Sequence, residues 1–166
     1  MRMYFFVNMY LSSIQKGIQA GHAAERYAYS FGLTEQYKDY IENYGTWIVL
    51  NGGSSTHAVS FETGSMNKIS QVLIDNKINY ASFTEPFLED CLTAICFLAP
   101  EQVYNREDYP DFKDFLIGIH PECSKYAGEY LKVTYDEEYE SWINNVMGSY
   151  ENAMLRELVT GAHLAI

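Results

Sequence analysis

Strand-length apolar runs recur along the first 100 residues, and stretches of helical composition separate most of them. This alternation constrains the fold more than any other feature of the sequence. The expected strands, which are rich in apolar and aromatic residues, cover residues 3–9, 46–50, 79–83 and 93–99. The order strand, helix, strand, helix, strand is typical of an α/β domain built as three layers, with a sheet between two layers of helices.

Helices are expected between these strands. Residues 14–31 and 34–44 have helical composition, and a glycine follows each stretch where a helix end is expected. After the second strand comes a turn signal of one asparagine and two glycines, and residues 58–61 are expected to complete a hairpin. Thr63 or Ser65 is then expected to cap a third amphipathic helix.

The chain beyond residue 100 is more acidic and lacks further strand-length apolar runs, so we expect one domain of residues 1–100 and an extension of residues 101–166. Residues 138–160 carry apolar side chains at helical spacing and predict one long amphipathic helix. Its apolar face, with Trp142, Val146 and Tyr150, is expected to pack on the first domain.

The extension is also the acidic part of the chain. The formal net charge is −11, of which residues 101–166 contribute −8 and residues 1–100 contribute −3. An acidic surface repels a phosphate backbone, whose binding depends on Lys and Arg. The charge therefore argues against DNA binding, and any contact with RNA has to rest on a local site.

The remaining composition indicates a soluble cytoplasmic protein with no membrane association. Apolar runs are too short to span a bilayer, and the N-terminus lacks the features of a secretory signal. Three cysteines, at positions 91, 96 and 123, form no disulfide framework, and their odd number suits a reducing compartment. No ligand set for a metal stands out, and no cofactor is expected.

Polar residues spaced four, three and four apart form one stripe along the first expected helix: Gln15, Gln19, His22 and Arg26. Small residues around the stripe would let the helix lie close to a sheet while these side chains project. Two carboxamides beside a histidine could bind a carbonyl and a hydroxyl together. A solvated polar helix face is the alternative interpretation.

Residues 13–24, directly after the first strand, resemble the first-helix signature of class 2 peptidyl-tRNA hydrolases, the archaeal and eukaryotic type, with its Gln-x-x-His-Ala core. Residues 83–88 and 92–95 resemble a second pattern of hydrolase-like members, Phe-x-Glu-Pro-x-Leu followed by Leu-Thr-Ala. The resemblance covers about residues 3–100. It implies a mixed four-stranded sheet with helices on both sides, and hydrolysis of the ester between a peptide and the terminal ribose of tRNA.

Carried over by position, the resemblance implies four catalytic residues: Gln19, His22, Glu85 and Thr93. His22 could act as the base, or Glu85 could orient the attacking water. Gln15, Lys16 and Arg26 are the expected substrate-binding residues. Gln15 stands where the family has a lysine, with Lys16 beside it, and the loop between Glu85 and Thr93 is shorter than usual in the family.

Three functions remain open from the sequence. The first is an active hydrolase of peptidyl-tRNA or a related aminoacyl ester, and the second is an inactive hydrolase-fold protein that binds a protein or nucleotide through its acidic surface. The third is an unrelated α/β domain with an accidental match. A short hydrolase-like chain with its own acidic extension could belong to a phage, and a homodimer is also open.

Overall fold

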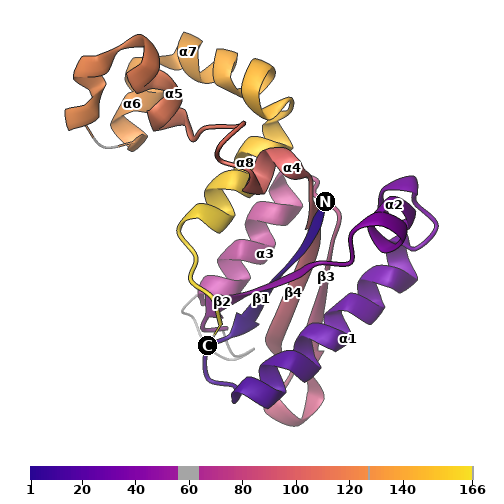
Figure 1. Cartoon of the computed structure of the whole chain (residues 1–166). Helices are drawn as coiled ribbons and strands as arrows, with labels where there is room; N and C mark the ends of the chain where they lie inside the picture. The colour runs from indigo at the N-terminus through magenta and orange to yellow at the C-terminus, as the bar shows by residue number, and fades with distance from the viewer. Residues whose placement is uncertain (56–63, 127, 166) are drawn as a thin grey trace. The chain divides into compact units, whose positions relative to one another are not determined.

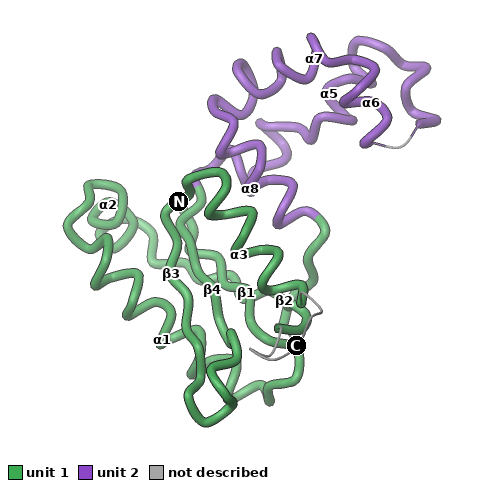
Figure 2. The backbone as a smooth tube through the Cα atoms, turned by 180° about the vertical axis from the view of Figure 1, so that it is seen from behind, with its two compact units in different colours: residues 1–99, 161–166 green, residues 100–160 purple. Residues whose placement is uncertain are grey.

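A computed structural model describes residues 1–55, 64–126 and 128–165. The chain divides into two compact units, and Figure 2 shows them in different colours. Unit 1 comprises residues 1–99 and 161–166, and unit 2 comprises residues 100–160. In the described part of the chain, no helix is both long enough and apolar enough to cross a membrane.

Unit 1 contains a mixed four-stranded sheet packed with helices, as the sequence predicts (Figure 1). The strand order is β2-β1-β4-β3; β1 is parallel to β2 and antiparallel to β4, and β3 is antiparallel to β4. Along the chain the elements are β1 (Arg2–Asn8), α1 (Ser13–Phe31), α2 (Glu35–Asn43), β2 (Trp47–Gly53), α3 (Ser65–Asp75), β3 (Tyr80–Glu85), the 3₁₀ turn η1 (Pro86–Leu88) and β4 (Cys91–Ala99).

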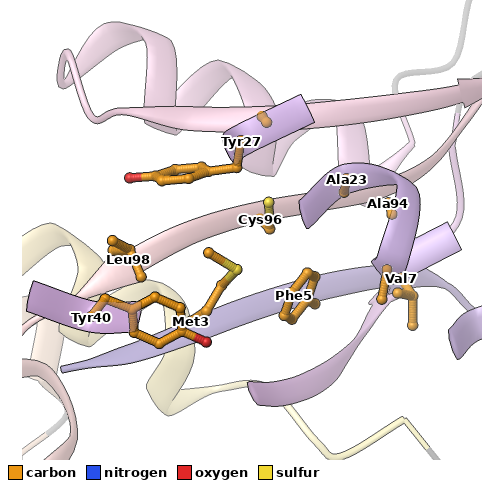
Figure 3. Packing of buried hydrophobic residues seen from close by; sticks show 11 residues of the cluster. Met3, Phe5, Val7, Ala23, Tyr27, Tyr40, Ala94, Cys96 and Leu98 are labelled. Carbon is orange, nitrogen blue, oxygen red and sulfur yellow. The ribbon is translucent and has the colours of Figure 1, made fainter. Parts of the chain in front are cut away.

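One face of the sheet packs on α1 and α2 through small and aromatic side chains. The core on this side joins strand residues to helix residues, and Figure 3 shows Met3, Phe5, Val7, Ala23, Tyr27, Tyr40, Ala94, Cys96 and Leu98 within it. Ala20 and Ala23 are fully buried, and their small size lets α1 lie close to the strands. The polar stripe of α1 is therefore held beside the sheet.

The other face of β1 packs on α3. A Cβ atom added to Gly52 in β2 would lie 2.9 Å from the Met66 side chain of α3 and 3.2 Å from Phe6, so a larger residue would require these neighbours to shift. Gly64 is the N-cap of α3, and Ser65 is its first helical residue, where its hydroxyl donates to the Gly52 carbonyl at 2.7 Å. The expected cap by Ser65 is therefore wrong. Thr63 and the short strand expected at residues 58–61 lie outside the described residues.

The chain returns to unit 1 near its C-terminus. Residues 163–165 run along the edge of β2, where Leu164 bridges Leu50 in antiparallel fashion. The Asn51 N–H donates to the His163 carbonyl at 2.8 Å, and the Ala165 N–H donates to the Val49 carbonyl at 3.0 Å. Unit 1 is therefore assembled from two separate stretches of sequence.

Unit 2 is helical: α4 (Glu101–Tyr104), α5 (Phe112–Ile119), η2 (Pro121–Lys125), α6 (Gly128–Thr134), α7 (Asp136–Trp142), the π-turn η3 (Ile143–Met147) and α8 (Tyr150–Thr160). The prediction of one continuous helix over residues 138–160 is wrong, because the π-turn and Gly148, at φ +76°, interrupt it. Trp142 packs with Phe112 inside unit 2, where its Nε1 donates to the Pro110 carbonyl at 2.9 Å. The packing of this apolar face on residues 1–100 stays a prediction.

Arg156 of α8 organises the first part of unit 2. Its side chain is 1% exposed, and its Nη1 donates to an Asp111 carboxylate oxygen at 2.7 Å. Nη2 donates to the carbonyls of Gln102 and Tyr109. A buried charge is tolerated when it is paired and hydrogen-bonded; both Nη atoms meet this condition, whereas the buried Nε has no hydrogen-bond partner among the described residues. Through its Nη atoms this arginine joins α8 to the segment between α4 and α5.

Candidate active site

Three of the four residues expected to be catalytic form one hydrogen-bonded group, the Gln19–Glu85–Thr93 trio. The Gln19 Nε2 donates to Glu85 Oε2 at 2.9 Å, and the Thr93 hydroxyl donates to Gln19 Oε1 at 2.8 Å. Gln19 comes from α1, Glu85 from the end of β3 and Thr93 from the start of β4. The fold thus joins residues that are 66 and 74 positions apart in sequence.

A β-bulge accounts for the position of Thr93. Phe83 pairs with Ala94 and Thr84 pairs with Leu92, so Thr93 is an extra residue in β4 with no partner in β3. A bulge re-aims side chains locally and is over-represented next to active sites. Here the Thr93 hydroxyl reaches Gln19 on α1 and also lies 3.1 Å from the Phe83 carbonyl oxygen.

Glu85 is held at both carboxylate oxygens. Oε2 accepts from Gln19, and Oε1 accepts from the Phe87 backbone N–H at 3.4 Å, which makes Glu85 the N-cap of η1. The side chain is still partly exposed. A carboxylate with both oxygens located in this way can accept a proton from a water molecule or orient it.

His22 and Arg26 lie one and two turns further along α1 and share a contact with Phe83. The His22 ring stacks on Phe83, with centroids 4.5 Å apart, and the Arg26 guanidinium carbon lies 4.7 Å from the same centroid. Arg26 also donates to the Ser82 carbonyl at 3.3 Å. In the described residues, His22 has no hydrogen bond to the trio; its Nδ1 lies 3.9 Å from a carboxylate oxygen of Glu25.

Gln15 and Lys16 occupy the first turn of α1 in different settings. Gln15 completes a capping box: its N–H donates to the Ser12 hydroxyl at 3.3 Å, and its Oε1 accepts from the Ser12 N–H at 3.0 Å. Lys16 is buried, at 8% exposure, one helical turn before Gln19. The expected substrate-binding residue Gln15 therefore also has a structural role at the helix start.

A cleft of about 560 Å³ opens at the C-terminal end of β1, next to the trio. The residues that line it are Asn8, Tyr10, Leu11, Gln15, Ser55, Phe87, Leu88, Glu89, Cys91 and Thr93. Thr93 belongs to both the cleft and the trio, so the cleft reaches the hydrogen-bonded group. The volume lies in the range of small-molecule sites.

Asn8 is a buried polar residue of the cleft that sequence reasoning did not select. Its Nδ2 donates to the Ser55 hydroxyl at 2.9 Å, and its Oδ1 accepts from the Tyr10 N–H at 3.0 Å. It thereby holds together two loops that border the cleft. In the sequence, Asn8 stands out only as an asparagine that interrupts an apolar strand. Many strand ends share this feature, so it does not identify a functional residue.

The loop from η1 to β4 contains two consecutive residues in the left-handed region, Glu89 at φ +56° and Asp90 at φ +57°. Neither is glycine, so the backbone conformation is unfavourable and depends on the surrounding structure. Phe87, Leu88 and Glu89, which precede or belong to this strained pair, line the cleft.

The site offers acid–base and hydrogen-bonding groups. In the part of the chain that the structure describes, no group of three or more His, Cys, Asp or Glu side chains could hold a metal ion.

No protein-family model matches the chain, and no curated protein matches it. Function is therefore inferred from the geometry of this site and from the sequence patterns.

Proposed function

We propose that the protein hydrolyses the ester between a peptide, or an N-blocked amino acid, and the terminal ribose of tRNA, and that the Gln19–Glu85–Thr93 trio is the centre of this site. The observation that carries the proposal is the hydrogen-bonded trio opening onto a cleft. The sequence patterns of class 2 peptidyl-tRNA hydrolases supply its chemical identity. The reaction would take place in the cytoplasm, as part of translation.

Support also comes from the agreement between the two patterns and their structural settings. The pattern containing Gln19 and His22 lies on the helix after the first strand, and the one containing Glu85 and Thr93 spans the turn between β3 and β4. A chance match in an unrelated domain would have no reason to join Gln19, Glu85 and Thr93 by hydrogen bonds. The mixed sheet order β2-β1-β4-β3 and helices on both faces agree with the fold that the resemblance implies.

In the proposed reaction, a water molecule attacks the ester carbonyl carbon while Glu85 or His22 accepts its proton. The carbon–oxygen bond to the ribose then breaks, and the ribose oxygen receives a proton from the same base. Gln19 has a second Nε2 hydrogen beyond the one donated to Glu85, and this hydrogen can donate to the developing oxyanion. Lys16 is one turn away and adds positive charge near the start of α1.

The first experiment incubates the protein with N-blocked aminoacyl-tRNA and measures ester cleavage against the spontaneous rate. Glu85→Gln keeps an oxygen that can accept from Gln19 but removes the carboxylate. We expect it to lower turnover by about 10²–10⁴-fold, the usual effect of losing a catalytic acid or base. We expect His22→Ala to lower it by a comparable factor if the imidazole is the base.

Glu35→Gln is the matched control, since Glu35 is an exposed carboxylate on the neighbouring helix α2. It should cleave like the parent, and all three variants should keep the thermal unfolding temperature of the parent. If Glu85→Gln and His22→Ala both cleave at the parental rate, the site assignment is wrong even for a hydrolase.

A second function is favoured by the charge of the chain. The described residues that line the cleft include no Lys or Arg, and residues 101–166 contribute −8 to the net charge. These features suit an inactive hydrolase-fold protein whose acidic surface binds a basic partner. A parent protein that leaves well-formed substrate uncleaved would support this second function against the first.

A further inference from the structure

Two aromatic side chains that project into solvent border the same cleft from different loops. Tyr10, between β1 and α1, is 79% exposed, and Phe87, in η1, is 95% exposed. Large apolar rings at this exposure bury almost no surface in the folded chain, so they contribute little to its stability. Because both rings border the cleft, they can pack against a ligand when one occupies it.

The other groups in the cleft restrict the chemistry of an occupant. Among the described lining residues the only carboxylate is Glu89, and there is no cation to receive a phosphate. Polar groups come from Asn8, Gln15, Ser55 and Thr93. The Gln15 Nε2 donates to no described residue, because the capping box uses only its Oε1 and backbone. Such a cleft suits an uncharged, planar, hydrogen-bonding group.

We propose that this cleft binds a nucleoside, with the base packed against Tyr10 and Phe87 and its polar edge within reach of the Gln15 carboxamide. Bases stack on aromatic side chains in single-stranded nucleic-acid sites, where a positively charged groove binds the phosphates. A nucleoside has no phosphate, so its base can stack without that groove. This inference rests on the proposed function and deepens it: the nucleoside is the terminal one of tRNA, whose ribose carries the ester.

The placement of Thr93 connects the two parts of the site. Thr93 lines the cleft and donates to Gln19, which in turn contacts Glu85. A ribose at the inner end of the cleft would bring its ester to the trio. An acyl side chain is the competing occupant, but it would leave the Gln15 Nε2 without a partner, and burying an unpaired polar group is unfavourable.

Cys91 provides a direct probe of occupancy. It lines the cleft and is partly exposed, whereas Cys96 and Cys123 are buried. N-ethylmaleimide should therefore label the native protein at Cys91, and Cys91→Ser should abolish that labelling. The experiment measures by mass spectrometry how adenosine slows the labelling of Cys91, with ribose and N-acetyl-leucine methyl ester as the comparison ligands.

We expect adenosine to protect Cys91 while ribose and the acyl ester do not. Tyr10→Ala and Phe87→Ala should each raise the adenosine concentration for half-protection by roughly 5- to 100-fold, the range that stacking on one ring contributes. Tyr10→Phe and Phe87→Tyr keep a ring and should behave like the parent. Tyr29→Ala is the matched control, because Tyr29 is 94% exposed on α1 and does not line the cleft.

Protection by the acyl ester alone, no protection by millimolar adenosine, or parental protection in both alanine variants would each overturn the nucleoside proposal. The ester-cleavage assay separates the two proposals. Cleavage without adenosine protection would remove this inference and leave the hydrolase function standing. Protection without cleavage would leave a nucleoside-binding protein and remove the hydrolase function.

Discussion

At the scale of single residues, Gln19 has the most constrained position in the candidate site. An ionised carboxylate only accepts hydrogen bonds, so the amide nitrogen of Gln19 faces Glu85 and its oxygen faces the Thr93 hydroxyl. Leaving a buried amide unpaired would cost about 1–3 kcal/mol. The side chain is therefore held in one orientation, and the proposed reaction uses its second amide hydrogen as the donor to the oxyanion.

The sequence predicts part of this arrangement and misses the rest for physical reasons. Helical periodicity puts Gln19 and His22 on one stripe of α1, and that stripe does face β3. The capping role of Gln15 depends on where the helix begins, and the orientation of Thr93 depends on a bulge between β3 and β4. A single sequence contains no clear signal for either strand register or the exact helix start.

Cys96 in the core of unit 1 leads to a prediction about alkaline stability. Burial raises the pKa of the Cys96 thiol to about 12, whereas an unfolded cysteine titrates at about 8.5. Between these values the folded state binds one more proton than the unfolded state. The contribution of the protonated Cys96 thiol to the free energy of unfolding is complete below about pH 8.5. It is lost as the pH rises toward 12, at about 1.4 kcal/mol per pH unit.

We therefore expect the free energy of unfolding in urea to fall more steeply with pH in the parent than in Cys96→Ala, measured from pH 8 to 11. The variant loses a constant amount of packing energy at every pH, so only the difference in slope tests the titration. Burial also raises the pKa of Tyr27, which adds a slope above about pH 10 to both proteins. Equal slopes in this range would contradict the assignment.

At the scale of elements, the clearest difference from the sequence prediction is the helix expected over residues 138–160. Apolar residues keep a helical spacing across the whole stretch, so periodicity alone does not reveal a break. The interruption comes from the π-turn at Ile143–Met147 and from Gly148. Gly148 is a breaker signal visible in the sequence, but the prediction rests on the apolar spacing alone.

Gly148→Ala should destabilise unit 2 by about 1–2 kcal/mol, because an alanine in the left-handed region brings its Cβ too close to the next carbonyl oxygen. Gly118→Ala is the matched change within α5, where a Cβ meets no atom within 4 Å. It should stabilise the unit by about 0.5–1 kcal/mol, as replacement of glycine inside a helix usually does. Denaturant unfolding of both variants tests the pair, and the same sign for both would show that the break at Gly148 is misassigned.

At the scale of the whole molecule, the net charge of −11 opposes the tRNA binding that the proposed function requires. We expect weak affinity for full-length tRNA that falls by roughly tenfold or more between 50 and 200 mM salt, because the few cations have to bind phosphates without support from a basic surface. Filter binding across this range tests the expectation. Tight affinity that is nearly constant over the same range would contradict an electrostatic contact with the tRNA backbone.

The C-terminal segment on β2 makes a second prediction at this scale. Deleting residues 162–166 removes two backbone hydrogen bonds to β2 and the contact of Ala165 with the core of unit 1. The expected loss is about 1–3 kcal/mol in the free energy of unfolding, measured in urea. Leu164→Ala keeps the backbone bonds and changes a side chain that is 66% exposed, so it should stay close to the parent. An equal loss in both proteins would show that the backbone pairing is not the cause.

The same segment has a consequence for the nascent chain. During synthesis the sheet strands of residues 1–99 leave the ribosome first, yet β2 lacks its edge partner until residues 163–165 are available. An open strand edge is a template for pairing with another chain. Helix α4 packs against α8, and Arg156 donates to the Gln102 carbonyl between them. This packing brings the two ends of residues 100–160 together, so a shorter loop has to close before residues 163–165 can pair with β2. Helical folding of this stretch would thus limit the time in which newly made chains can aggregate through β2.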